Sequence, residues 1–103
     1  MGIREGGSGP FKVETVDVTV DFASVAAATA VDQAVTVPQS RVGDSIIVTP
    51  LGTWPAGLAN PQGRCLVAGT VQVRLTNPTA GAVDPASQSI RFCMIHDIPG
   101  TEP

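Results

Sequence analysis

The residues of this sequence that could take part in catalysis are few and widely spaced. His96 is the only histidine, and although Asp97 follows it, neighbours in a sequence cannot by themselves form a catalytic triad, so we expect His96 at a surface or an interface. Asp17 and Asp21 share a face of one predicted strand, but they lie about 13 Å apart at strand rise, which is too far for a paired-carboxylate site. No serine has a GxSxG context. The sequence therefore predicts that the protein is not an enzyme and has no catalytic residues.

Sequence signals for cofactors and metal ions are also missing. The glycine-rich segment 6–9 does not follow a predicted strand and lacks the lysine of a phosphate-binding loop. One histidine and two cysteines without CxxC spacing provide too few ligands for a metal site. We expect Cys65 and Cys93 to be reduced, buried thiols that pack as small apolar side chains. A disulfide remains an alternative if their two strands are neighbours.

The composition describes a chain that is short of charge. Of its 103 residues, 43% are hydrophobic and 15% are charged, whereas roughly 25% of residues are charged in an average soluble protein. A core of valine and alanine buries little area per residue, and a small domain with few large side chains is marginally stable alone. Both facts favour a homo-oligomer in which subunit contacts extend the core.

The distribution of charge argues against nucleic acid and membrane as partners. The net charge is −3, and the six basic residues are scattered along the chain without forming a basic patch. No run of about 18 apolar residues occurs, so no transmembrane helix is predicted. The N-terminal residues lack the apolar segment of a secretory signal.

Six segments have the residue pattern of β-strands. They are residues 12–22, 31–37, 44–49, 64–68, 70–76 and 89–96. Two more strands would result if the first segment were split and the loop at 50–63 contributed one. Turn-forming residues separate the segments at the spacing of a sandwich or barrel, and no helix of ordinary length is predicted. We therefore predict an all-β fold, a small antiparallel β-sandwich.

The strand at 89–96 is apolar on both faces. Ile90, Phe92 and Met94 lie on one side, and Cys93 and Ile95 share the other side with Arg91. Such a strand, and the similar one at 44–49, is either central in a sandwich or covered by a partner chain. We therefore predict that Arg91, Cys93 and Ile95 contribute to an oligomer interface.

Two further strands alternate between apolar and polar residues. Val71, Val73 and Leu75 are predicted to face the core from strand 70–76. In strand 12–22, alternate residues from Val16 to Phe22 form the apolar face. The other face is interpreted as an acidic, solvated stripe that discourages edge-to-edge aggregation. Its members are taken to be Glu14, Asp17 and Asp21.

The longest irregular segment, residues 50–63, contains the only tryptophan. A loop of this length in a small domain is commonly a binding loop or is packed by a neighbour. Trp54 is therefore a fourth predicted interface residue, since tryptophan is frequent among the residues that dominate binding energy. The alternative is that Trp54 closes the open end of the sandwich.

The chain divides into three parts by composition. Residues 1–11 are predicted to be a flexible N-terminal arm, residues 12–98 the β-sandwich domain and residues 99–103 a C-terminal tail. The glycine-rich arm cannot pack a core by itself, so it is either a frayed end or a segment that becomes ordered on a partner. Ile3, Arg4 and Phe11 are the residues in the arm that could anchor it.

Motifs beyond residue 20 suggest a family. Asp21-Phe22 is followed by a small-residue spacer, VTVP at 35–38, VGD at 42–44 and a Pro/Gly-rich loop. GTVQVRLTN at 69–77 and a Val-Asp-Pro-Ala turn at 83–86 precede the last strand. This pattern resembles a recurrent module of tailed-bacteriophage virion proteins. The resemblance implies a jelly-roll-like sandwich, commonly oligomeric with trimers frequent, a turn at Gly43-Asp44, and an Asn77 side chain that caps the turn after it.

Modules of this kind occur as small capsid decoration proteins, of cement or head-fibre type, and at the distal ends of fibres. A fibre protein would carry a long shaft before the module, whereas about twenty residues precede it here, so the resemblance favours a decoration protein. This implies a virion location on the capsid surface, and the host cytoplasm during assembly. The implied partners are the major capsid protein and the chain itself, as a trimer rather than a dimer.

A decoration protein needs one surface for the capsid and one for its own copies. Capsid contacts are assigned to Ile3, Arg4 and Phe11. The oligomer interface is assigned to Trp54, Arg91, Cys93 and Ile95. The first alternative is a distal module of a tail or head fibre that binds a receptor or a carbohydrate. A free-standing carbohydrate-binding module is another alternative, although it would need more exposed aromatic platforms than one tryptophan.

Overall fold

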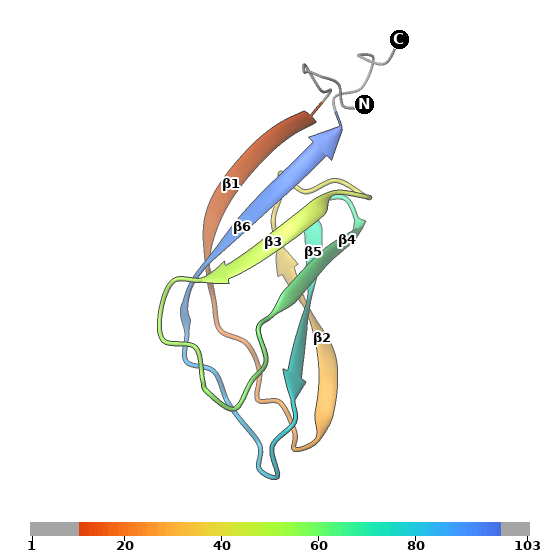
Figure 1. Ribbon diagram of the computed structural model, residues 1–103. Helices are drawn as coiled ribbons and strands as arrows, with labels where there is room; N and C mark the ends of the chain where they lie inside the picture. Colours follow the sequence, from red (N-terminus) through yellow and green to blue (C-terminus); the bar gives the residue numbers. More distant parts are fainter. Residues whose placement is uncertain (1–10, 98–103) are drawn as a thin grey trace.

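The computed structural model describes residues 11–97, which form six β-strands and no helix (Figure 1). The strands are β1 (Phe11–Val20), β2 (Thr29–Thr36), β3 (Ser45–Pro50), β4 (Gln62–Val67), β5 (Thr70–Asn77) and β6 (Gln88–Asp97). The predicted all-β fold is confirmed, and each of the six predicted segments corresponds to one strand. The predicted tail at 99–103 and residues 1–10 of the predicted arm lie outside the described residues.

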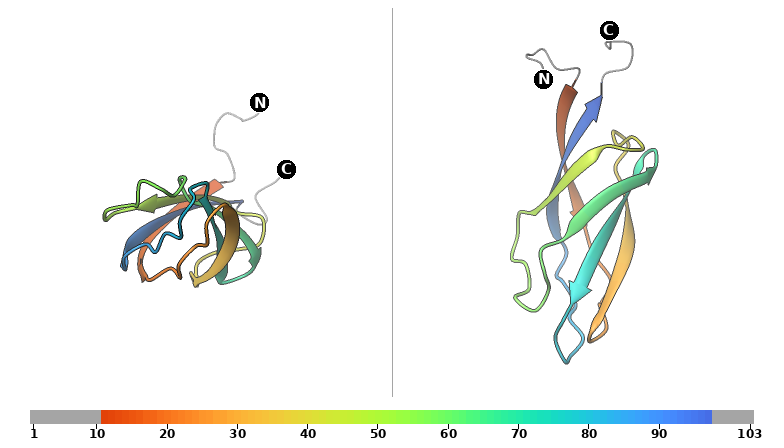
Figure 2. Two further views of the ribbon diagram at one scale, coloured as in Figure 1. Left: turned by 90° about the horizontal axis from the view of Figure 1, so that it is seen from below. Right: turned by 45° about the vertical axis from the view of Figure 1, so that its right-hand side comes forward.

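Two antiparallel sheets of three strands form a sandwich-like arrangement. The strand orders are β1-β6-β3 and β2-β5-β4, and Figure 2 shows the two sheets facing each other. β1 and β6 are paired over their whole length, from Phe11 opposite Asp97 to Val20 opposite Gln88. The molecule is therefore elongated, 52 × 24 × 23 Å, and both ends of the described chain lie at the same tip (Figure 1).

The core lies between the sheets and consists mainly of alternate residues from the two central strands. β5 contributes Val71, Val73 and Leu75, as predicted, and β6 contributes Ile90, Phe92 and Met94; all six are fully buried. Each such aliphatic or aromatic side chain stabilises the fold by about 1.5–3 kcal/mol when it is removed from water. The central position of β6 accounts for its buried face.

The other strand with two apolar faces, β3, differs from the prediction. It pairs only with β6 among the named strands and forms an edge of its sheet. Val48 is buried and Ile46 packs against the core, but Ile47 points to the opposite face and is 56% exposed. The alternative that this strand is central is wrong, because it forms an edge of its sheet, and cover by a partner chain stays a prediction.

Gly63 marks the point where the two sheets approach each other closely. β3 and β4 lie against each other along one side of the sandwich (Figure 2). A Cβ atom at Gly63 would lie 2.7 Å from Val48 Cγ2 and 3.2 Å from a methyl group of Val71. A glycine inside a strand commonly marks such a close approach. The backbone of β4 is consequently drawn toward the core at this residue.

Asn77, at the end of β5, connects two loops through its buried side chain. Its Nδ2 donates to the carbonyl oxygens of Val25 and Gly81, at 3.0 and 2.9 Å. Its Oδ1 accepts a hydrogen bond from the backbone N–H of Thr79 at 2.9 Å. The role in capping the following turn, which the family resemblance implied, is confirmed by these contacts.

Candidate functional site

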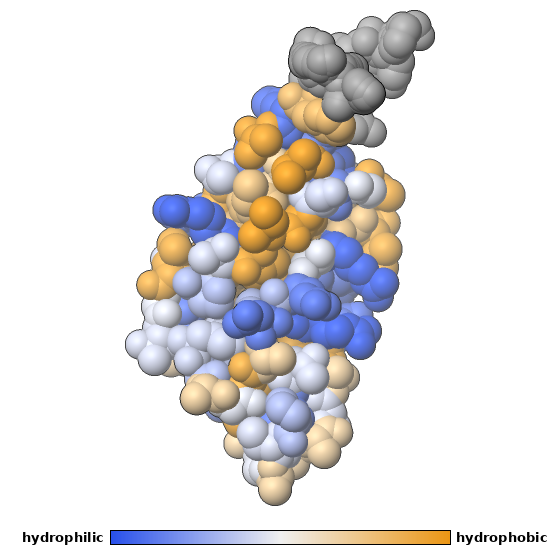
Figure 3. All heavy atoms as spheres, in the orientation of Figure 1, coloured by the Kyte–Doolittle hydropathy of each residue, from blue (hydrophilic) through white to orange (hydrophobic). Residues whose placement is uncertain are grey.

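An exposed apolar patch lies on the outer face of the β1-β6-β3 sheet, near the tip from which both ends of the chain emerge. We define this apolar patch as Phe11, Val13, Ile47, Cys93 and Ile95. The strand register places them together, because Val13 lies opposite Ile95 and Cys93 opposite Ile47. Val13 is 63% exposed and Ile47 is 56% exposed. In Figure 3, hydrophobic side chains gather in the upper half of the view, over β6 and β3.

An ion pair forms the polar border of the apolar patch. Asp17 and Arg91 lie opposite each other one row below it. Arg91 Nε donates to Asp17 Oδ1 at 2.8 Å, and Nη2 donates to Oδ2 at 3.1 Å. This two-pronged hydrogen bond lowers the pKa of the Asp17 carboxyl and raises the pKa of Arg91. The pair matches each charge with its opposite, so the patch and its border carry no excess charge.

A hollow of about 330 Å³, the terminal hollow, adjoins the apolar patch. It is lined by Phe11, Ile95 and the segment 41–45. The segment forms a tight turn, in which the backbone N–H of Asp44 donates to the carbonyl oxygen of Arg41 at 3.1 Å. Gly43 has a φ of 88°, which a side chain would disfavour, and the turn predicted at this glycine is confirmed. A surface with such a hollow can receive an apolar side chain from a partner.

His96 is buried behind the terminal hollow, contrary to the prediction of a surface or interface residue. Its side chain is 1% exposed. Nε2 lies 2.9 Å from Glu14 Oε1, and Nδ1 lies 2.7 Å from Asp44 Oδ2. Nδ1 makes no hydrogen bond with the described residues, so this second contact is a close approach of the carboxylate to the ring nitrogen. Asp44 Oδ2 instead accepts a hydrogen bond from the backbone N–H of Arg41 at 2.8 Å.

The contact with His96 also corrects the assignment of Glu14 to the acidic stripe. Glu14 is an even-numbered residue of β1 and shares the inner face with Val16, whereas Asp17 is on the outer face. The hydrogen bond with His96 lowers the pKa of the Glu14 carboxyl below its ordinary value, and the positive charges of Lys12 and Arg41 act in the same direction. His96, Glu14 and Asp44 thus tie β6, β1 and the turn before β3 together.

This cluster shares the histidine–carboxylate pair of a catalytic triad but contains no nucleophilic side chain. Both ring nitrogens face carboxylates, and the ring has almost no access to solvent. In the described part of the chain, no three His, Cys, Asp or Glu side chains have the arrangement of a metal site. The geometry supports a structural clamp.

The structure places the other predicted site residues apart. Trp54 is partly buried, lies edge-on to Phe22 with ring centroids 6.1 Å apart, and donates from Nε1 to the carbonyl oxygen of Ala59 at 3.1 Å. This packing corresponds to the alternative in which the ring closes the end of the sandwich, and its part in an interface stays a prediction. Ile3 and Arg4 lie outside the described residues. Phe11, assigned to the arm, is the first residue of β1 and half-exposed.

The two cysteines lie in different sheets and are both free. Cys65, on β4, is buried as predicted, whereas Cys93, on β6, is only partly buried because it belongs to the outer face. Their strands are not neighbours, so the condition for a disulfide is not met.

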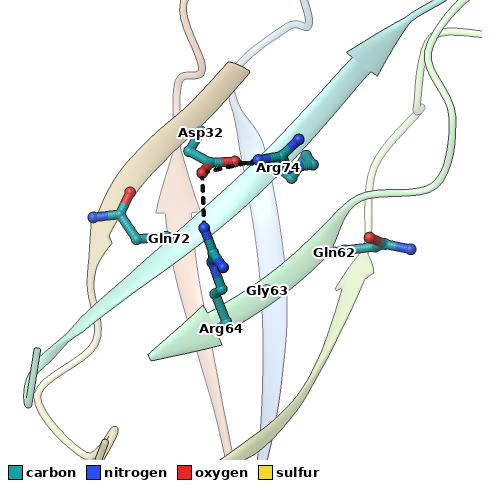
Figure 4. Close-up of a pocket in the computed structure, with 6 residues that line it drawn as sticks. All are labelled: Asp32, Gln62, Gly63, Arg64, Gln72 and Arg74. Carbon is teal, nitrogen blue, oxygen red and sulfur yellow. Dashed lines mark hydrogen bonds and ion pairs between the residues drawn. The ribbon is translucent and has the colours of Figure 1, made fainter. Parts of the chain in front are cut away.

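A second hollow, the polar hollow, lies on the outer face of the other sheet (Figure 4). It has a volume of about 200 Å³. Its lining consists of Asp32, Gln62, Gly63, Arg64, Gln72 and Arg74. The sequence does not predict this hollow, because its residues come from three strands whose order in the sheet is not encoded in local patterns.

Comparison of the chain with protein-family models, curated proteins and solved structures found no match. The resemblance to phage virion modules therefore stays a prediction. Within residues 11–97, no helix has the length and hydrophobicity needed to cross a membrane.

Proposed function

We propose that the protein is a structural component of a tailed-bacteriophage virion, which binds the outside of the capsid as a homo-oligomer and stabilises or decorates it. The observation that carries this proposal is the apolar patch on the outer face of the β1-β6-β3 sheet. Contiguous exposed apolar surface on a small soluble domain is a common mark of a protein–protein contact. The patch includes three predicted contact residues, Phe11, Cys93 and Ile95.

The apolar patch fits a contact between copies of the chain. Its centre is formed by aliphatic side chains, and the Asp17–Arg91 pair provides a polar border, as in the core-and-rim arrangement of stable interfaces. The terminal hollow beside it offers a place for an apolar side chain of the next subunit. The trimer is favoured over the dimer by the family resemblance alone.

The tip of the molecule is the end that we assign to the capsid. Phe11 and Asp97 are paired there, so the segments that precede and follow the sandwich both start from this tip (Figure 1). Ile3 and Arg4 would anchor the arm on the major capsid protein, with Phe11 at its base. The arm and the jelly-roll-like character of the sandwich are parts of this proposal.

The alternative function is a distal module of a tail or head fibre that binds a receptor or carbohydrate. The polar hollow favours this alternative, since it offers a ligand several hydrogen-bonding side chains on a face that the apolar patch does not use.

Removal of residues 1–10 tests the capsid-binding function. We expect the truncated protein to keep the fold and oligomeric state of the full chain and to lose most of its binding to capsids assembled without it, measured by co-sedimentation. Equal binding of both forms would show that the arm does not anchor the protein. If the full chain does not bind such capsids at all, the decoration role is wrong.

A further inference from the structure

The polar hollow carries an excess of positive charge, which the Asp17–Arg91 pair does not have. Arg74 Nε donates to Asp32 Oδ1 at 3.0 Å, and Arg64 reaches the other oxygen, Oδ2, only at 3.4 Å. Figure 4 shows both guanidinium groups directed at this single carboxylate from two neighbouring strands. Two positive groups thus share one negative group, whereas the Asp17–Arg91 pair is matched one to one.

Arg64 is the more available of the two guanidinium groups. Arg74 also contacts Oδ2 through Nη2 at 3.4 Å, so it engages both oxygens of Asp32, while Arg64 has a single long contact. A planar guanidinium with free donors binds a carboxylate through two parallel hydrogen bonds, which are among the strongest that side chains form. Asp32 then serves to position Arg64, and the charge of Arg74 keeps the site positive.

The rest of the lining indicates what else the ligand carries. Gln62 and Gln72 flank the two arginines (Figure 4), and each amide can both donate and accept a hydrogen bond. The hollow has no apolar side chain in its lining, unlike most pockets for drug-sized molecules, and its 200 Å³ is below their usual range of roughly 300–1,000 Å³. Its floor is the backbone at Gly63, where β4 is drawn toward the core.

We propose that the polar hollow binds a sugar acid, with the carboxylate of the sugar on Arg64 and its hydroxyl groups on Gln62, Gln72 and Asp32. A carboxylate would neutralise the unmatched positive charge. Neighbouring hydroxyl groups would form hydrogen bonds with the glutamine amides, which can both donate and accept. A peptide or protein partner would use apolar or aromatic anchors, which this lining does not offer. The inference does not depend on the role of the apolar patch.

Titration with D-glucuronate, followed by backbone and side-chain amide NMR shifts, tests the proposal. We expect saturable shifts at Arg64, Gln62 and Gln72, with a dissociation constant in about the millimolar range that is usual for one small ring. Glucose, which lacks the carboxylate, and acetate, which lacks the hydroxyls, serve as probes at equal ionic strength. Both should bind about tenfold more weakly, since a hydrogen bond to a charged group contributes about this factor.

Matched variants assign the binding to the hollow. Arg64→Gln should weaken glucuronate binding about tenfold or more, whereas Lys12→Gln, which removes a positive charge from the other sheet, should leave it unchanged. Arg64 is half-exposed, and retained amide dispersion would show that its variant folds. Shifts that do not saturate, equal binding of acetate and glucuronate, or equal effects of the two variants would each overturn the proposal.

Discussion

The buried side chain of His96 joins three separate parts of the fold. It lies near the end of β6, at the tip where β1 and β6 extend beyond the other sheet (Figure 1). The carboxylates of Glu14 and Asp44 contact its two nitrogens. A polar cluster of this kind fixes the relative positions of β1, β6 and the 41–44 turn, because each partner is costly to leave unpaired.

The Glu14 contact predicts an acid sensitivity. The pKa of Glu14 is lower in the folded chain than its ordinary value, so the unfolded chain binds a proton more readily. The contribution of Glu14 to stability is therefore complete above the ordinary carboxyl pKa and is lost as the pH falls through the lowered folded-state value. Urea unfolding between about pH 6 and about pH 3 should show a smaller loss of stability for Glu14→Gln than for the wild type.

Asp17→Asn provides a comparison for this experiment. Asp17 lies on the face of β1 opposite to Glu14, and its pKa is lowered by Arg91 on the neighbouring strand β6, so this variant should also reduce the acid sensitivity. The two effects should add, because the pairs share no partner. An identical pH dependence for Glu14→Gln and the wild type would contradict the role given to the His96 contact.

The sequence predicted the burial of some individual residues and could not predict the burial of others. The core positions of Val73 and Phe92 follow from the period of two within their strands. The burial of His96 does not, because it depends on Asp44, which is 52 positions away and reaches the ring through a turn. Alternate residues of a strand share a face, so the sequence itself places Glu14 on the inner face with Val16. The assignment of Glu14 to the acidic stripe did not follow this rule.

Among the strands, β4 owes its position to the absence of a side chain at Gly63. Gly63→Ala would place a Cβ atom 2.7 Å from Val48 Cγ2, and the strands would have to separate. We expect a loss of about 1–3 kcal/mol in the free energy of unfolding, as is typical for an overfilled core, measured by urea denaturation.

Gly81→Ala is the matched control for this substitution. A Cβ atom at Gly81 would meet nothing within 4 Å, so its variant should stay within about 0.5 kcal/mol of the wild type. A neutral Gly63→Ala would mean that the two sheets are farther apart at this point than the structure indicates.

The strands themselves were largely predictable from the sequence, and their arrangement was not. Alternation and turn residues are local signals, and they identify each of the six strands. Which strands pair is decided by contacts between distant segments, such as β1 with β6. This is why the sequence left open whether β3 was covered, and why it gave no indication that Asp32, Arg64 and Arg74 meet on one face.

For the whole molecule, association between copies of the chain would explain both the low content of charged residues and the uncovered apolar face. A 103-residue chain with 15% charged residues buries its core between two small sheets and still exposes the apolar patch. Association through this face would remove Val13, Ile47 and Ile95 from water. Each buried CH₂ group contributes about 0.8 kcal/mol, so the contact would add to the stability that the small valine-rich core provides.

Light scattering on the wild type and two matched variants tests most directly whether the apolar patch is the contact between subunits. Ile47, in the apolar patch, and Leu66, on the other sheet, are both 56% exposed. We predict that the wild type and Leu66→Asp have three times the 10.5 kDa mass of the chain. Ile47→Asp should be a folded monomer, because it would bury an unpaired charge in the contact. A wild-type monomer at micromolar concentration, or an Ile47→Asp variant that assembles like Leu66→Asp, would contradict the account.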